Sequence, residues 1–176
     1  AHRPLWKRKT CERSEEMTEL TEKEIIKKLS TACVKREYCT QDMQKKMRLW
    51  GVDADTQASV LAYLTKNKYV DNARYARAFV FDKARYNKWG RKKIDYSLRL
   101  KGIDYALYAD LLDEVEDDDY RETLLQILKT KRKQIKDTDE YKVRNKLIRF
   151  ALGRGFTMDQ TLKALKEMGQ EIDDIF

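Results

Sequence analysis

Hydrophobic residues recur three and four positions apart through most of the chain, which is the spacing of one face of an α-helix. The recurrence is organised around Gly51, Gly102 and Gly155. Four and eight positions before each glycine the residues are apolar and predict a helical stripe: Met43 and Met47, Ile94 and Leu98, Leu147 and Ala151. Seven, ten and thirteen positions after each glycine a second helical stripe is predicted: Ala58, Leu61 and Leu64, Ala109, Leu112 and Val115, Leu162, Leu165 and Met168.

A third stripe opens each of these sets, so that every set predicts three helices. Its members are Ile25, Ile26, Leu29 and Cys33, then Tyr75, Phe79 and Val80, then Leu124, Leu125 and Leu128. The glycines are 51 and 53 positions apart, which is the size of a small helical unit. The chain is therefore predicted to be an internal repeat of three three-helix units.

Each glycine is predicted to end one helix and begin a chain reversal. A glycine adopts the left-handed backbone conformation after the last helical turn, and in a Schellman motif the next residue contacts the residue five positions earlier. The predicted apolar contacts are Val52 with Met47, Ile103 with Leu98, and Phe156 with Ala151. The N-caps predicted for the following helices are Asp53, Asp104 and Thr157, the last in a capping box with Gln160.

The fold class expected is all-α: an elongated, curved solenoid of three tandem three-helix repeats. The only proline is Pro4, and no run of alternating β-branched residues predicts a strand. Small repeats that each bury a modest apolar stripe form an elongated molecule rather than a sphere. We expect a basic N-terminal tail at 1–19, repeat 1 at 20–70, repeat 2 at 71–117, repeat 3 at 118–168 and a C-terminal tail at 169–176.

Composition indicates an acidic partner for a cytoplasmic protein. Lysine and arginine outnumber aspartate and glutamate by eight, which favours nucleic acid, a nucleoprotein or another acidic surface, although plain helical proteins can also be basic. No apolar run reaches the roughly 20 residues of a membrane span. Cys11, Cys33 and Cys39 are odd in number and lack the spacing of a zinc or redox pair, so reduced thiols are expected. Whether a leader precedes residue 1 stays open.

Catalysis is not expected from this sequence, nor is a metal or a cofactor. His2 is the only histidine, and no glycine-rich nucleotide loop is present. The acid-rich segment 113–119 lacks the glycine-containing spacing of a calcium loop, so we expect an N-terminal turn and a linker there.

Charge alternates in blocks along the chain. Residues 83–101 are basic with Asp95 as the single acid, residues 104–119 are acidic, and 129–136 are basic again. These blocks are either solvated helix faces or one positive strip that contacts phosphates or an acidic protein surface. The residues of this basic strip are Lys83, Arg85, Lys88, Arg91, Lys92, Lys93, Arg99, Lys101, Lys131, Arg132, Lys133, Arg149 and Arg154. Two aromatic residues lie between these cations in the sequence. Trp89 is expected to pack the turn before Gly90, whereas for Tyr86 two roles stay open, packing in the fold or stacking on a nucleobase.

The middle of the chain resembles the RecX family, regulators of the bacterial recombinase RecA. The resemblance runs along 69–80, 83–85, 89–94 and 98–103, and more loosely over 20–168. Its signature residues are Tyr69, Asp71, Arg74, Tyr75, Trp89, Gly90 and Gly102. Two positions depart from the family pattern: Ser97 stands where an acidic residue is common, and Arg91 where a proline is common.

The resemblance implies a curved solenoid that lies in the groove of the RecA filament on single-stranded DNA. It implies contacts with neighbouring RecA protomers and restraint of ATP hydrolysis, strand exchange and filament growth, hence a role in recombination, DNA repair and the SOS response. A monomer with no membrane contact is expected, with single-stranded DNA as a further candidate partner. Two alternatives stay open: a helical module that binds single-stranded DNA directly, and an inert scaffold.

Overall fold

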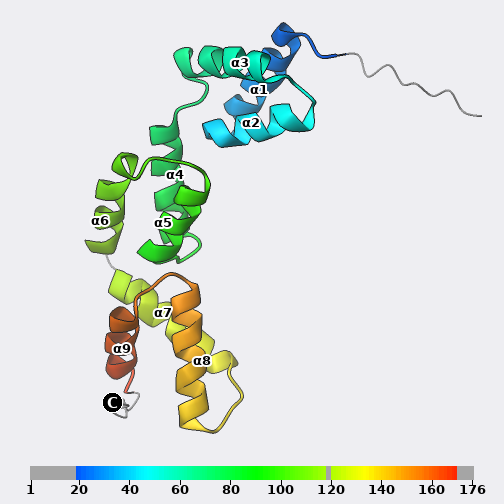
Figure 1. Cartoon of the computed structure of the whole chain (residues 1–176). Coiled ribbons are helices and arrows are strands. Elements are labelled where there is room, and N and C mark those ends of the chain that lie inside the picture. Colours follow the sequence, from blue (N-terminus) through cyan, green and yellow to red (C-terminus); the bar gives the residue numbers. More distant parts are fainter. Residues whose placement is uncertain (1–18, 118–119, 170–176) are drawn as a thin grey trace, which may run out of the picture.

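The computed structural model describes residues 19–117 and 120–169 (Figure 1). Within these ranges the chain forms helices and no strand. The helices are α1 (Glu22–Lys35), α2 (Thr40–Leu49), α3 (Ala54–Lys66), α4 (Asn72–Arg85), α5 (Arg91–Leu100), the 3-10 helix η2 (Tyr105–Leu107), α6 (Ala109–Asp117), α7 (Tyr120–Gln134), α8 (Glu140–Gly153) and α9 (Met158–Glu167). The expected tails, apart from Glu19 and Gly169, lie outside the described residues, as do His2 and Cys11.

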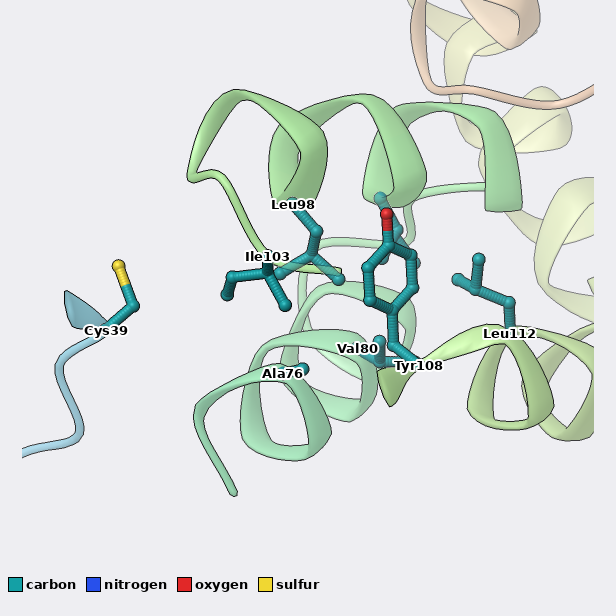
Figure 2. Packing of buried hydrophobic residues seen from close by; sticks show 8 residues of the cluster. Cys39, Ala76, Val80, Leu98, Ile103, Tyr108 and Leu112 are labelled. Carbon is teal, nitrogen blue, oxygen red and sulfur yellow. The ribbon is translucent and has the colours of Figure 1, made fainter. Parts of the chain in front are cut away.

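Three groups of three α-helices follow one another along an elongated, curved molecule (Figure 1). Each group has its own buried core, centred on Leu29 and Met47 in repeat 1, on Val80 and Leu98 in repeat 2, and on Leu124, Leu147 and Leu165 in repeat 3. Figure 2 shows the core of repeat 2. The all-α solenoid of three-helix repeats is therefore confirmed.

The three glycine turns adopt the geometry that the sequence predicts. Gly51, Gly102 and Gly155 have φ angles of 71°, 68° and 96°. The amide of the residue after each glycine donates to the carbonyl five positions earlier, at 3.0 Å for Val52, 3.2 Å for Ile103 and 3.2 Å for Phe156. Each glycine amide donates three positions back in the same way, so all three turns are Schellman motifs.

The helix that follows each turn is where the three repeats differ. Asp53 caps α3, and Thr157 forms the predicted capping box with Gln160 at the start of α9. The prediction for Asp104 is wrong in its detail, because its carboxylate accepts from the amide of Ala106 and caps η2 rather than an α-helix. One 3-10 turn therefore precedes α6 in repeat 2.

The predicted apolar stripes before the glycines are confirmed, whereas the stripes after them are only partly buried. All six residues of the preceding stripe are fully buried. After the glycines, Leu64, Leu112 and Leu165 are buried, but Ala58 is exposed. In α3 the buried face instead passes through Val60 and Leu64.

The prediction of a turn and a linker in the acid-rich segment 113–119 is wrong for residues 113–117, which are helical. Asp113 and Glu116 lie in α6, which extends to Asp117. Acidic residues near a helix C-terminus are unfavourable with respect to the helix dipole. Both carboxylates are ion-paired with Arg91 of α5, which offsets that cost.

Repeats 2 and 3 are joined through backbone hydrogen bonds at the start of α5. Gly90 is its N-cap without a side chain to cap the helix. The Gly90 amide donates to the carbonyl of Arg154 at 2.7 Å, and the Lys92 amide to that of Gly155 at 3.1 Å. The glycine turn of repeat 3 therefore supplies the acceptors that α5 would otherwise need from a capping side chain.

Repeats 1 and 2 are joined at the equivalent place, but through side chains. Cys39, the N-cap of α2, is fully buried and belongs to the core cluster of repeat 2; Figure 2 shows it approaching this core beside Ile103. Next to it, Lys101 donates to Asp42 at 2.6 Å, and Thr40 and Asn72 exchange hydrogen bonds. At both junctions the start of the second helix of one repeat contacts the next repeat, through backbone hydrogen bonds in one case and side chains in the other.

The Asp42–Lys101 pair makes the first junction sensitive to acid. Burial alone would raise the pKa of Asp42, but hydrogen bonds from Lys101 and Cys39 hold it below its ordinary value of 3.8. A lowered carboxyl pKa stabilises the fold above the unfolded-state pKa, and this contribution is lost as the pH falls through the folded-state pKa. In a double-mutant cycle of Asp42→Asn and Lys101→Met, we expect a coupling of about 1 kcal/mol at pH 7.

Urea denaturation of the four proteins at pH 7 and at about pH 3 measures this coupling. The coupling should be smaller at about pH 3, because that pH lies below the ordinary carboxyl pKa of 3.8 and protonation of Asp42 removes its attraction for Lys101. Equal couplings at the two pH values would contradict the assignment.

Candidate partner-binding surface

The structure divides the residues of the basic strip by what surrounds each cation. They come from the end of α4, the turn before α5, α5 itself, the turn after it, α7, α8 and the turn after α8, all in repeats 2 and 3. Some are ion-paired with acids of the same chain, some lie over aromatic rings, and some face solvent. Only the cations that no acid of the chain neutralises can attract an acidic partner strongly.

Four cations of the strip are ion-paired. Arg91 binds Asp113 and Glu116 and donates to the hydroxyl of Tyr105. These hydrogen bonds raise the pKa of Arg91 above its ordinary value. The other three pairs are Arg99 with Asp95, Lys101 with Asp42, and Arg132 with Glu140. The positive charge of these four residues is neutralised by carboxylates of the same chain.

Two cations of the strip lie over the ring of Trp89. The Nζ atoms of Lys83 and Lys93 lie 4.9 Å and 4.4 Å from the Trp89 ring centroid. Trp89 also packs edge-on against Phe79, at 6.3 Å between ring centroids, and against the core of repeat 2. Trp89 therefore serves the fold, and the two lysines contact its ring while keeping their charge.

Three further cations lie over phenylalanine rings that the sequence analysis did not single out. Arg85 lies over Phe81 at 5.0 Å. Lys131 and Arg154 lie over Phe150 at 5.3 Å and 5.1 Å. The spacing of four between Phe81 and Arg85, and between Phe150 and Arg154, is a sequence signal for these contacts. Lys131 comes from another helix, so no local pattern indicates it.

Lys88 lies in the turn between α4 and α5. Its φ angle is 57°, which is unusual for a residue with a side chain. Lys88 lines two clefts at the junction of repeats 2 and 3. One cleft, of about 160 Å³, has Arg91, Glu116 and Gln160 among its lining residues. The other, of about 290 Å³, is here called the junction cleft and is lined by Lys88, Gln126, Ile127, Thr130, Lys131, Gln134, Phe150 and Arg154.

Lys92, Lys133 and Arg149 are the outward members of the strip. All three are exposed, and none belongs to an ion pair formed among residues 19–117 and 120–169. Tyr86 is also outward, with 80% of its surface exposed. These side chains are available to a partner without rearrangement of the fold.

The signature residues other than Trp89 are structural or lie at the junctions. Asp71 caps α4, and Arg74 binds Glu37 of repeat 1 at 2.6 Å. Tyr69 packs against the core of repeat 1, and Tyr75 against that of repeat 2. Gly90 and Gly102 occupy the junction and the turn described above. Arg74 and Gly90 therefore join neighbouring repeats, and the other signature residues stabilise single repeats.

Within residues 19–117 and 120–169, no three histidine, cysteine, aspartate or glutamate side chains gather in a way that could hold a metal ion. None of the helices found there has the length and apolarity that a bilayer span requires. The described thiols are Cys33 and Cys39, both free, and burial raises the pKa of each.

Two models of RecX domains match this chain. The second three-helix domain of RecX matches residues 71–112, and the third three-helix domain matches residues 117–165, together just over half of the chain. The Regulatory protein RecX of Clostridium botulinum (strain Eklund 17B / Type B) is 31% identical over 160 residues, which cover 88% of this chain and 74% of the relative. The chain belongs to the RecX family.

A RecX of another genus shares the similarity. The Regulatory protein RecX of Acinetobacter baylyi is 30% identical over 137 residues, covering 78% of this chain and 83% of the relative. Both relatives carry the name Regulatory protein RecX.

Solved RecX structures share the fold. The crystal structure of RecX from Lactobacillus salivarius aligns with a TM-score of 0.67 at 19% identity, over 84% of this chain and 98% of that one. A second crystal structure, of a regulatory protein RecX, aligns with a TM-score of 0.74 at 16% identity, over 85% of this chain and 73% of that one. At these identities the likeness supports the arrangement of helices alone.

Proposed function

We propose that this RecX family chain binds the RecA filament on single-stranded DNA and restrains ATP hydrolysis, strand exchange and filament growth. The observation that carries the proposal is the basic region of repeats 2 and 3, whose cations at Lys88, Lys92 and Arg149 have no acidic partner within residues 19–117 and 120–169. A nucleoprotein filament presents both phosphates and protein surface to such a region. Membership of a family of regulatory proteins agrees with this.

The shape of the molecule supports a partner that is itself extended. The three repeats follow one another along a curve (Figure 1), so a long surface is offered rather than a compact patch. In this proposal the chain acts as a monomer in the cytoplasm, and its repeats at 20–70, 71–117 and 118–168 contact successive parts of the filament.

The experiment is an inhibition curve with purified protein. We expect DNA-dependent ATP hydrolysis by RecA to fall as the protein is added, at ratios no higher than about one per RecA protomer if each copy covers at least one protomer. Normal hydrolysis at saturating protein would sink the proposal. If the protein instead binds labelled single-stranded DNA tightly, with a steep salt dependence and no effect on RecA, the chain is a DNA-binding module.

A further inference from the structure

We propose that the junction cleft between repeats 2 and 3 binds one nucleotide of single-stranded DNA, with the phosphate held by its cations and the base placed against Phe150. This inference rests on the proposed function for the source of the strand, which is the DNA in the filament. It adds a defined binding site and a ligand class to that function.

Three cations reach the cleft from three different elements. Lys88 comes from the turn before α5, Lys131 from α7, and Arg154 from the turn after α8. Arg154 is held in place, since one guanidinium nitrogen donates to the carbonyl of Asn87 at 2.8 Å and the group lies over Phe150. Cations that converge from separate elements on a preformed cleft favour a compact anion such as a phosphate.

The remaining lining contains no carboxylate. Gln126, Thr130 and Gln134 offer amide and hydroxyl groups, while Ile127 and Phe150 are apolar. In the neighbouring cleft the carboxylate Glu116 is already bound by Arg91 and Gln160. An anion that enters the junction cleft therefore meets no negative charge from the residues that line it.

The ring and the amides favour a nucleotide over an acidic peptide. A carboxylate would be attracted by the three cations but has no flat face to place against Phe150 and no donor for the amide oxygens of Gln126 and Gln134. A nucleobase has a flat face that stacks on an aromatic ring and an edge that exchanges hydrogen bonds with amides. The cleft volume of about 290 Å³ suits a single small ligand rather than a folded segment.

This site is weak when it acts alone. One phosphate contact on a single strand gives a dependence of log K on log salt of only about −0.7. The site therefore orients a strand that the filament already holds. The rival module, which binds DNA tightly by itself, requires a steeper slope.

The first experiment measures anisotropy of a fluorescein-labelled oligo-dT across a salt series. The test variant is Lys88→Asn with Lys131→Gln; asparagine tolerates the left-handed backbone at position 88. The matched control is Lys129→Gln with Lys136→Gln, which removes the same charge from exposed positions outside the cleft. We expect the test variant to lose about tenfold in affinity at low salt and to flatten the slope by no more than about 0.7, with little change in the control.

The second experiment locates the base. An oligonucleotide with 5-iodo-deoxyuridine, irradiated in the assembled RecA–DNA–protein complex, should crosslink to Phe150, as identified by mass spectrometry. Phe150→Leu should abolish this crosslink while the protein still melts cooperatively. Crosslinks confined to Tyr86 would overturn the cleft as the site.

The outcomes separate this inference from the proposed function. Equal strand affinity in the test and control variants overturns the inference. If the test variant loses RecA inhibition but binds oligo-dT like wild type, the cleft binds protein, so the inference falls and the proposed function stands. If wild type does not inhibit RecA but the test variant alone loses strand binding, the cleft assignment stands and the proposed function falls.

Discussion

Replacing Gly155 by alanine is expected to lower the free energy of unfolding by about 2–4 kcal/mol. An added Cβ would lie 2.5 Å from the backbone nitrogen of Lys93 and 2.8 Å from the carbonyl oxygen of Gly90. These are backbone atoms that cannot move aside cheaply. The φ angle of 96° adds strain for any residue with a side chain. The variant should therefore lose the hydrogen bonds between repeats 2 and 3.

Two other glycines separate the contributions of strain and contact. Gly51 occupies the same turn in repeat 1, with a φ of 71° and open space around it, so Gly51→Ala should cost only the left-handed strain of about 1–2 kcal/mol. Gly90 has an ordinary φ of −81° but would place a Cβ 2.5 Å from the carbonyl of Gly155, so Gly90→Ala isolates the steric contact.

Urea denaturation of the three variants and wild type measures these differences. If Gly155→Ala costs no more than Gly51→Ala, the close approach of Gly90 and Gly155 does not stabilise the molecule.

The glycine turns could be predicted because their cause is local. The turn needs three consecutive residues: a glycine in the left-handed conformation, an apolar residue and a helix-capping residue. Gly51, Val52 and Asp53 supply them in that order. The buried stripe before each glycine follows from the same spacing. The stripe after it follows less closely, because the buried positions differ between repeats: Val60 lies nine positions after Gly51, whereas Leu112 and Leu165 lie ten positions after their glycines.

The contacts between repeats could not be predicted, because they join residues far apart in sequence. Nothing near Gly90 indicates that its amide donates to the carbonyl of Arg154. The sequence also shows Cys39 only as a thiol, whereas its position at the start of α2 places it in the core of the next repeat. Packing of one repeat on another decides both.

The numbers of acidic and basic residues in the sequence predict that the candidate surface is positive, but not which cations remain unpaired on it. Arg91 and Lys101 look like Lys88 and Lys92 in the sequence, yet the first two are ion-paired within the molecule and the other two are not paired with any acid in the described ranges. The acids that bind Arg91 lie in the next block along the chain. The acidic block therefore neutralises part of the basic one and leaves the rest available to a partner.

Reversing the charges of Lys92, Lys133 and Arg149 to glutamate is expected to raise the concentration needed for half-inhibition of RecA ATP hydrolysis by about tenfold or more. These three cations are exposed on three different helices, and no ion pair among the described residues contains them. Reversal turns attraction toward an acidic filament surface into repulsion. The fold should tolerate it, since the favourable negative charge of Lys92→Glu in the first turn of α5 offsets the unfavourable one of Lys133→Glu in the last turn of α7.

The matched control reverses Lys23, Lys35 and Lys66, which are exposed on helices of repeat 1 and change the net charge by the same amount. We expect this control to inhibit RecA nearly as well as wild type, because its reversed charges lie outside the basic region of repeats 2 and 3. Thermal melts of both triple variants show whether either effect comes from unfolding. An equal loss of inhibition in the two would mean that overall charge, rather than this surface, governs binding; unchanged inhibition in the first would place the contact on another face.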